Sequence, residues 1–171
     1  MPDGGSGWST CTGWLPDNGH MSSDRVSVTR VIRATPERIF ELLDDPQRHP
    51  EIDGSGTVKA SRGGSRRLAL GDAFGMSMHW GVAYGTRNEV VALEPDRTIA
   101  WRTLGPWPLT LVATGRTWRY DLEPVEGGTR VTETWDISTE AALARPVVRR
   151  LADLTRHNME RTLERIASVV E

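Results

Sequence analysis

The sequence predicts an α+β fold in which a curved antiparallel sheet of about seven strands wraps around a long C-terminal helix. Three observations predict it: a strand-like run followed at once by a short helix pair, a series of short β-like runs joined by tight turns, and a final amphipathic helical segment. A sheet that curves around one helix encloses a cavity, and we expect the function to lie there.

The first β-like run, 26–34, leads into the short helix pair. Thr35 is the expected N-cap, and Pro36 occupies the first helical position, where its fixed φ suits a helix. The first helix then carries one apolar stripe: Ile39, Phe40, Leu42 and Leu43. Pro46 ends this helix, and we expect a second, very short helical turn that ends before Pro50.

The middle of the chain alternates strand-like runs with turns rich in Gly, Pro and Asp. We expect strands at 57–60, 71–79, 85–93, 98–104, 114–123 and 129–137. Short strands joined by tight turns indicate antiparallel pairing of neighbours, so the runs predict a meander.

The last helix is expected to begin at Pro146 and to run to about Val170, which is roughly 25 residues. Its apolar residues form one stripe at helical spacing: Val148, Leu151, Thr155, Met159, Leu163, Ile166 and Val170. We expect this stripe to face the concave side of the sheet.

Four segments carry a resemblance to a known family. They are His-Pro-Glu-Ile-Asp-Gly-Ser-Gly at 49–56, Gly-Asp-Ala-Phe-Gly-Met-Ser-Met at 71–78, Trp-Arg-Tyr-Asp-Leu at 118–122 and Gly-Thr-Arg-Val-Thr-Glu-Thr-Trp at 128–135. The chain resembles the SRPBCC superfamily, which holds START domains and pollen-allergen-like proteins, and within it the polyketide cyclase/dehydrase-like branch. The resemblance implies a helix-grip fold with an apolar pocket. It implies no particular reaction, because the superfamily mixes enzymes, carriers and sensors.

Composition excludes several classes of function. We expect a disordered, Gly- and Ser-rich tail over 1–23 and one helix-grip domain over 24–171. A formal net charge of −2 argues against nucleic-acid binding, and no run is long and apolar enough for membrane insertion.

The only cysteine, Cys11, rules out an intramolecular disulfide and fits the cytoplasm. The oligomeric state stays open, with a homodimer as one alternative.

Aromatic residues at alternating strand positions predict the lining of the pocket, because side chains two apart point to the same face. Rigid aromatic rings with polar tips suit a small apolar or aromatic ligand that carries a few oxygens. The alternative is that these rings only fill the core between sheet and helix. The expected ligand-binding residues are Met76, Met78, Tyr84, Asn88, Trp101, Trp118, Tyr120, Trp135 and Met159.

Glu133 is the leading catalytic candidate. If Trp135 faces inward, so does Glu133, and burial would raise the pKa of its carboxyl. Such a group could act as a general acid or base on a polyketide-like carbonyl. The alternative is that Thr132, Thr134 and Asp136 face inward and that Glu133 is solvated. His79, at the end of its strand, is the second catalytic candidate.

The loop after the helix pair is the expected rim of the pocket, with His49, Asp53 and Ser55 as its candidates. The alternative is structural: Asp53 and Ser55 bond local backbone groups, and the glycines of the loop allow positive φ. The sequence lacks HxH, HExxH and CxxC spacings, so we expect no metal and no cofactor.

Three functions therefore stay open, and the sequence alone does not decide whether the protein is an enzyme. The first is binding of a hydrophobic or aromatic, polyketide- or lipid-like ligand. The second is an aromatase or cyclase that closes rings by aldol chemistry and dehydration. The third is a protein-interaction module with a vestigial cavity. A buried carboxylate or histidine beside an open cavity would favour the enzyme, and a collapsed cavity beneath an exposed apolar patch would favour the module.

Overall fold

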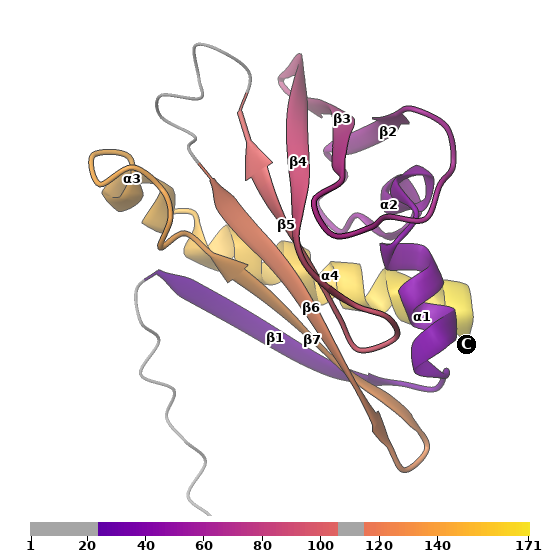
Figure 1. The fold of residues 1–171 in the computed structure, drawn as a ribbon. Helices are drawn as coiled ribbons and strands as arrows, with labels where there is room; N and C mark the ends of the chain where they lie inside the picture. Colours follow the sequence, from indigo (N-terminus) through magenta and orange to yellow (C-terminus); the bar gives the residue numbers. More distant parts are fainter. Residues whose placement is uncertain (1–23, 106–114) are drawn as a thin grey trace, which may run out of the picture.

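The computed structural model describes residues 24–105 and 115–171 (Figure 1). The expected tail over 1–23 and the loop residues 106–114 lie outside the described residues. The strands are β1 (Arg25–Ile32), β2 (Val58–Arg62), β3 (Ala73–Trp80), β4 (Val82–Glu94), β5 (Thr98–Leu104), β6 (Arg116–Val125) and β7 (Gly128–Asp136). The helices are α1 (Pro36–Leu43), the 3₁₀ turn η1 (Pro46–Arg48), α2 (His49–Ile52), α3 (Arg145–Arg149) and α4 (Ala152–Val170).

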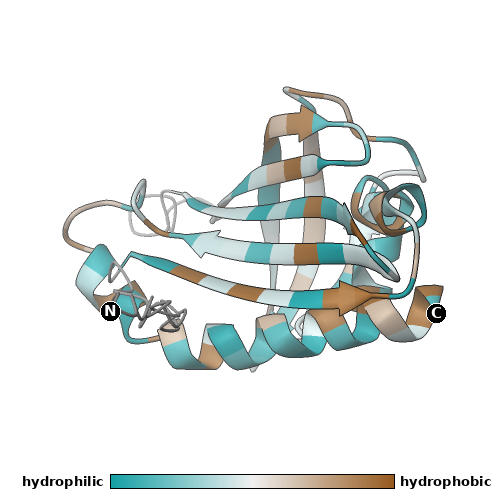
Figure 2. Ribbon diagram, turned by 90° about the horizontal axis from the view of Figure 1, so that it is seen from below, coloured by the Kyte–Doolittle hydropathy of each residue, from teal (hydrophilic) through white to brown (hydrophobic). Residues whose placement is uncertain are grey.

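The seven strands form one sheet in the order β1-β7-β6-β5-β4-β3-β2, and every neighbouring pair is antiparallel. Helix α4 runs along one side of this sheet (Figure 2). The predicted fold class, a helix-grip fold, is therefore confirmed. None of the helices among the described residues is long and apolar enough to cross a membrane.

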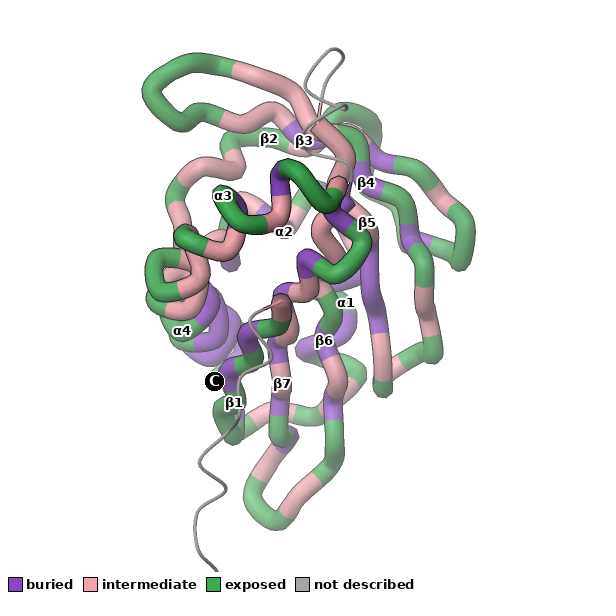
Figure 3. The backbone as a smooth tube through the Cα atoms, turned by 90° about the vertical axis from the view of Figure 1, so that its left-hand side faces the viewer, coloured by how far each residue is buried: buried purple, intermediate pink, exposed green. Residues whose placement is uncertain are grey.

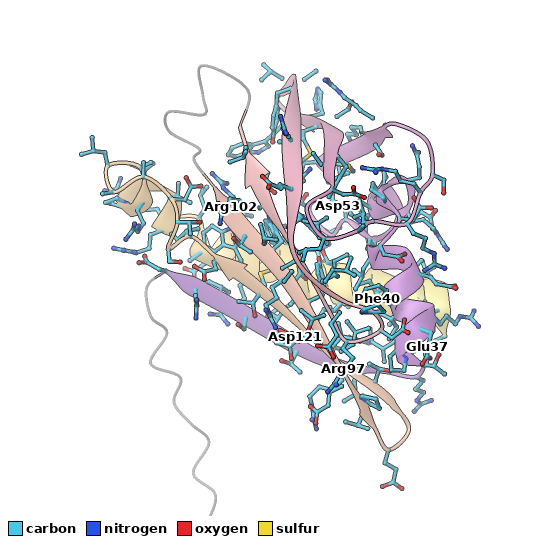
Figure 4. All side chains as sticks on the ribbon, viewed as in Figure 1. Glu37, Phe40, Asp53, Arg97, Arg102 and Asp121 are labelled. Atoms are coloured by element: carbon cyan, nitrogen blue, oxygen red, sulfur yellow. The ribbon has the colours of Figure 1, made fainter. Side chains whose placement is uncertain are left out.

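The core lies between the concave side of the sheet and the helices. The predicted stripe of α1 is buried in full: Ile39, Phe40, Leu42 and Leu43. In Figure 4, Phe40 points toward the sheet, whereas Glu37 of the same helix points outward. The C-terminal half of α4 turns its buried side toward the strands (Figure 3), with Met159, Leu163, Ile166 and Val170 in the core.

The prediction of one unbroken last helix is wrong. The helical segment divides into α3 and α4 at Arg150 and Leu151, where the amide groups bond the carbonyls of Val147 and Val148, three residues back instead of four. The N-terminal half of the predicted stripe also differs, because Leu151 and Thr155 are only half-buried. Both residues line the cavity between the sheet and α4.

The helix pair also departs from the prediction in detail. Thr35 is the N-cap residue of α1, but its side chain makes no capping hydrogen bond. The predicted short turn that ends before Pro50 is the 3₁₀ turn η1, but the chain continues directly into α2, which was not predicted and has Pro50 in its first turn. A proline is tolerated there because the first amides of a helix need no intrahelical acceptor.

The loop after α2 is held against α4 by two hydrogen bonds, and this contact positions one side of the cavity. The amide of Gly54 donates to Oγ1 of Thr162 at 3.0 Å, and Nη1 of Arg165 donates to the carbonyl oxygen of Asp53 at 2.6 Å. A Cβ on Gly54 would lie 2.1 Å from the carbonyl oxygen of Asn158. Glycine is thus required here because of the close approach to the α4 backbone.

Candidate functional site

A cavity of about 670 Å³ lies between the concave side of the sheet and α4. This volume falls within the range of small-molecule sites. Its wall is mainly apolar and aromatic, with residues from α2, the strands β2 to β7 and α4. Its large apolar groups include Ile52, Phe74, Met76, Met78, Trp101, Trp118, Leu151 and Met159.

The cavity opens between the β3–β4 hairpin and the beginning of α4. Trp80 and Val82 of the hairpin line the cavity yet are 65% and 70% exposed, and Leu154 of α4 is 51% exposed. Large apolar side chains that are both exposed and part of a cavity wall mark its mouth. An apolar molecule can therefore enter along an apolar path.

Three stacked rings form the inner wall. The ring of His49 stacks on Trp101 with centroids 5.0 Å apart, and Trp101 stacks on Tyr120 at 5.5 Å. Nε2 of His49 is 2.9 Å from the carbonyl oxygen of Leu43, to which it donates. Burial lowers the pKa of His49, so the imidazole is neutral and can serve as an aromatic surface.

The stack ends at a buried carboxyl group. The hydroxyl of Tyr120 donates to Oε1 of Glu133 at 2.8 Å, and the two residues are cross-strand partners on β6 and β7. Glu133 is 2% exposed, and its Oε2 has no hydrogen-bond partner among the described residues. Burial, reinforced by the charge of Asp53, raises the pKa of Glu133 to about 8, although the bond from Tyr120 opposes the shift. The carboxyl is therefore neutral at pH 7.

Several other polar groups of the wall are hydrogen-bonded to neighbouring residues. Oδ1 of Asn88 accepts a bond from Thr103 at 2.7 Å, and Nε of Arg116 donates to the buried Glu140 at 3.0 Å. Asp53 accepts bonds from Ser55 and from the amide of Val58. These side chains are already oriented, so they add fixed polar points to an apolar wall.

The structure brings most of the predicted site residues together. Met76, Met78, Tyr84, Asn88, Trp101, Trp118, Tyr120 and Met159 all line the cavity, as do Glu133, His49, Asp53 and Ser55. The carboxyl of Glu133 is buried, so the alternative of a solvated Glu133 is wrong. Asp53 and Ser55 also make the local bonds of the structural alternative.

Two predicted residues lie elsewhere. His79 is exposed and is absent from the cavity wall, because it alternates with the inward-facing Met78 on β3. Trp135 is 1% exposed but belongs to the core and not to the wall. It packs against Trp118, with ring centroids 6.5 Å apart, on a strand whose concave side α4 covers.

Sequence reasoning missed several wall residues that alternation would have found. Phe74 shares the face of Met76, Thr103 shares that of Trp101, and Arg116 shares that of Trp118. The polar residues Asn158 and Thr162 of α4 gave no such signal, because they flank the apolar stripe. Within the described ranges 24–105 and 115–171, no group of three or more His, Cys, Asp or Glu side chains is placed to hold a metal ion.

Comparison with known proteins agrees with this architecture. Residues 23–171 match the family described as polyketide cyclase / dehydrase and lipid transport. The chain therefore belongs to this family, within the SRPBCC superfamily that the sequence motifs resemble. The family and the fold support a role in ligand binding or in cyclisation.

A curated relative is the uncharacterized protein Rv0088 of Mycobacterium tuberculosis, 34% identical over 121 residues. The match covers 70% of this chain and 50% of that protein, so the chain spans about half the length of the curated relatives it matches. Among solved structures, MLL2253 from Mesorhizobium loti has a TM-score of 0.64 at 19% identity, with 85% of this chain and 95% of that chain covered. The di-domain ARO/CYC StfQ from the steffimycin biosynthetic pathway has a TM-score of 0.60 at 17% identity, with 85% and 50% covered. These likenesses show the fold alone.

Proposed function

We propose that the protein binds a small hydrophobic or aromatic molecule, polyketide- or lipid-like, in the cavity between sheet and α4. The observation that carries this proposal is the wall itself. It combines an apolar mouth, flat aromatic faces and a few fixed polar groups around about 670 Å³. Sites of this kind bind ligands by burying apolar surface and orient them with a few polar contacts.

A second candidate function is that of a cyclase, and the pair of Tyr120 and Glu133 favours it. A neutral carboxyl beside a cavity is placed to give a proton to a carbonyl oxygen, as a general acid does. The cavity is open and large, which argues against a vestigial cavity in a protein-interaction module.

We also propose a cytoplasmic location for the protein, because its single cysteine offers no intramolecular disulfide.

Trp118→Ala should weaken binding of the neutral apolar dye N-phenylnaphthylamine by about tenfold, because the variant loses a large aromatic surface of the wall. Titration of the dye, followed by its own emission and by quenching of tryptophan emission, measures the dissociation constant. Val31→Ala is the matched control, because Val31 is half-exposed on β1 and lies outside the wall. Absence of saturable dye binding in the unmodified protein would refute the proposed function.

A further inference from the structure

The carboxyl of Glu133 has one satisfied and one unsatisfied oxygen, and this asymmetry points to the chemistry of the ligand. Oε1 accepts the hydroxyl of Tyr120, and Oε2 is one of four buried side-chain atoms that have no partner among the described residues. A buried polar atom without a partner costs free energy. At a binding site, such an atom marks the place that a ligand group completes.

The surroundings of Glu133 decide whether it gives or accepts a hydrogen bond. The titratable groups that share its wall are His49, Asp53, Tyr84, Arg116 and Tyr120. Among them, the cation of Arg116 is held by Glu140 and Asp53 is acidic, while the ring of His49 is neutral. No cation of the described chain forms an ion pair with Glu133, so the carboxyl keeps its proton at neutral pH.

The location of that proton follows from the bond to Tyr120. A phenolic hydroxyl at 2.8 Å donates to Oε1, so Oε1 acts as the carbonyl oxygen of the acid and the proton belongs on Oε2. Glu133 lines the apolar cavity but is only 2% exposed, so its Oε2 offers a buried O–H donor at the cavity wall. The complementary ligand group is an acceptor without a proton of its own.

We propose that Glu133 is a specificity-determining residue whose Oε2 donates a hydrogen bond to a carbonyl oxygen of the ligand, so that the cavity selects apolar ring compounds that carry a ketone or quinone oxygen. The stack of His49, Trp101 and Tyr120 leads to this point and supplies the flat surface for the ring. The inference rests on the proposed function of the cavity and adds the class of its ligand.

Three probes with one ring skeleton test this inference: fluorene, fluorenone and fluorenol. Fluorene has no oxygen, fluorenone has an acceptor, and fluorenol has a hydroxyl that can donate to a carboxylate. Displacement of bound N-phenylnaphthylamine near pH 7 gives each dissociation constant. The preference for fluorenone over fluorene should fall by about tenfold in Glu133→Leu, which has no donor.

Glu133→Gln is the decisive second variant. Its amide can accept from Tyr120 and donate to the ligand, as the protonated acid does, so the preference for fluorenone should be retained within about threefold. Glu89→Gln, on the exposed side of β4, is the matched control and should leave all three constants unchanged. It shows that a general change of charge is not the cause.

The outcomes separate the two proposals. If none of the probes nor the dye binds, the proposed function fails and the inference fails with it. If fluorene binds but the unmodified protein and Glu133→Leu show the same preference for fluorenone, the cavity binds ligands and the inference is overturned. A preference for fluorenol that disappears in Glu133→Gln would also overturn it, because Glu133 would then accept a bond as a carboxylate.

Discussion

Replacing Gly54 by alanine should destabilise the protein by roughly 3 kcal/mol or more. The new Cβ would lie 2.1 Å from the carbonyl oxygen of Asn158 and 2.4 Å from the amide nitrogen of Thr162. Both are backbone atoms of α4, so no side-chain rotation relieves the clash. The loop after α2 would have to move away from α4 and lose its bonds to Thr162 and Arg165. Urea unfolding measures the change in the free energy of unfolding.

Gly64→Ala is the matched control for this prediction. A Cβ on Gly64 meets no atom within 4 Å, and its φ lies outside the left-handed region. The free energy of unfolding should change by less than about 0.5 kcal/mol in this variant. A cost below about 1 kcal/mol for Gly54→Ala would mean that the loop does not lie against α4 as described.

Periodicity explains why the fold could be predicted so fully. The apolar stripe of α1 and the alternation of inward-facing and outward-facing side chains in β6 and β7 are local patterns. When such patterns agree along the whole chain, they specify how its elements pack. Element ends were less predictable. The break at Arg150 and Leu151 has no proline or glycine to mark it. At this break the amide groups bond the carbonyl three residues back instead of the carbonyl four residues back, and no local sequence pattern signals this change.

Strand alternation predicted which side chains face the concave side of the sheet. It did not predict which of these side chains reach the cavity and which are covered by α4. Glu133 and Trp135 share a face of β7, yet Glu133 reaches the cavity and Trp135 is covered. The position of a residue in the alternation shows which face of the sheet its side chain lies on. It does not show how far α4 extends over that face. The stacked position of His49 was also hidden, because it depends on how α2 meets Trp101, and those residues are far apart in the chain.

Glu133→Gln should make the protein more stable at pH 8, and the gain should disappear near pH 5. The pKa of Glu133 is about 8 in the folded chain and near the ordinary 4.5 in the unfolded chain, because only folding buries the carboxyl. Below about pH 4.5 both states hold the proton, and the favourable contribution of the neutral acid is complete. Between the two pKa values the unfolded state releases the proton, so the free energy of unfolding falls as the pH rises.

This loss should amount to about 3–5 kcal/mol between about pH 5 and pH 8, at 1.36 kcal/mol for each pKa unit. Glutamine keeps the bond from Tyr120 but does not titrate, so Glu133→Gln should lack this slope. Urea unfolding across the pH range measures it in both proteins. Glu89→Gln, exposed on β4, should follow the unmodified protein within about 0.5 kcal/mol. Parallel stability curves for the unmodified protein and Glu133→Gln would show that Glu133 is already ionised in the folded state, and the donor role of its Oε2 would then be lost as well.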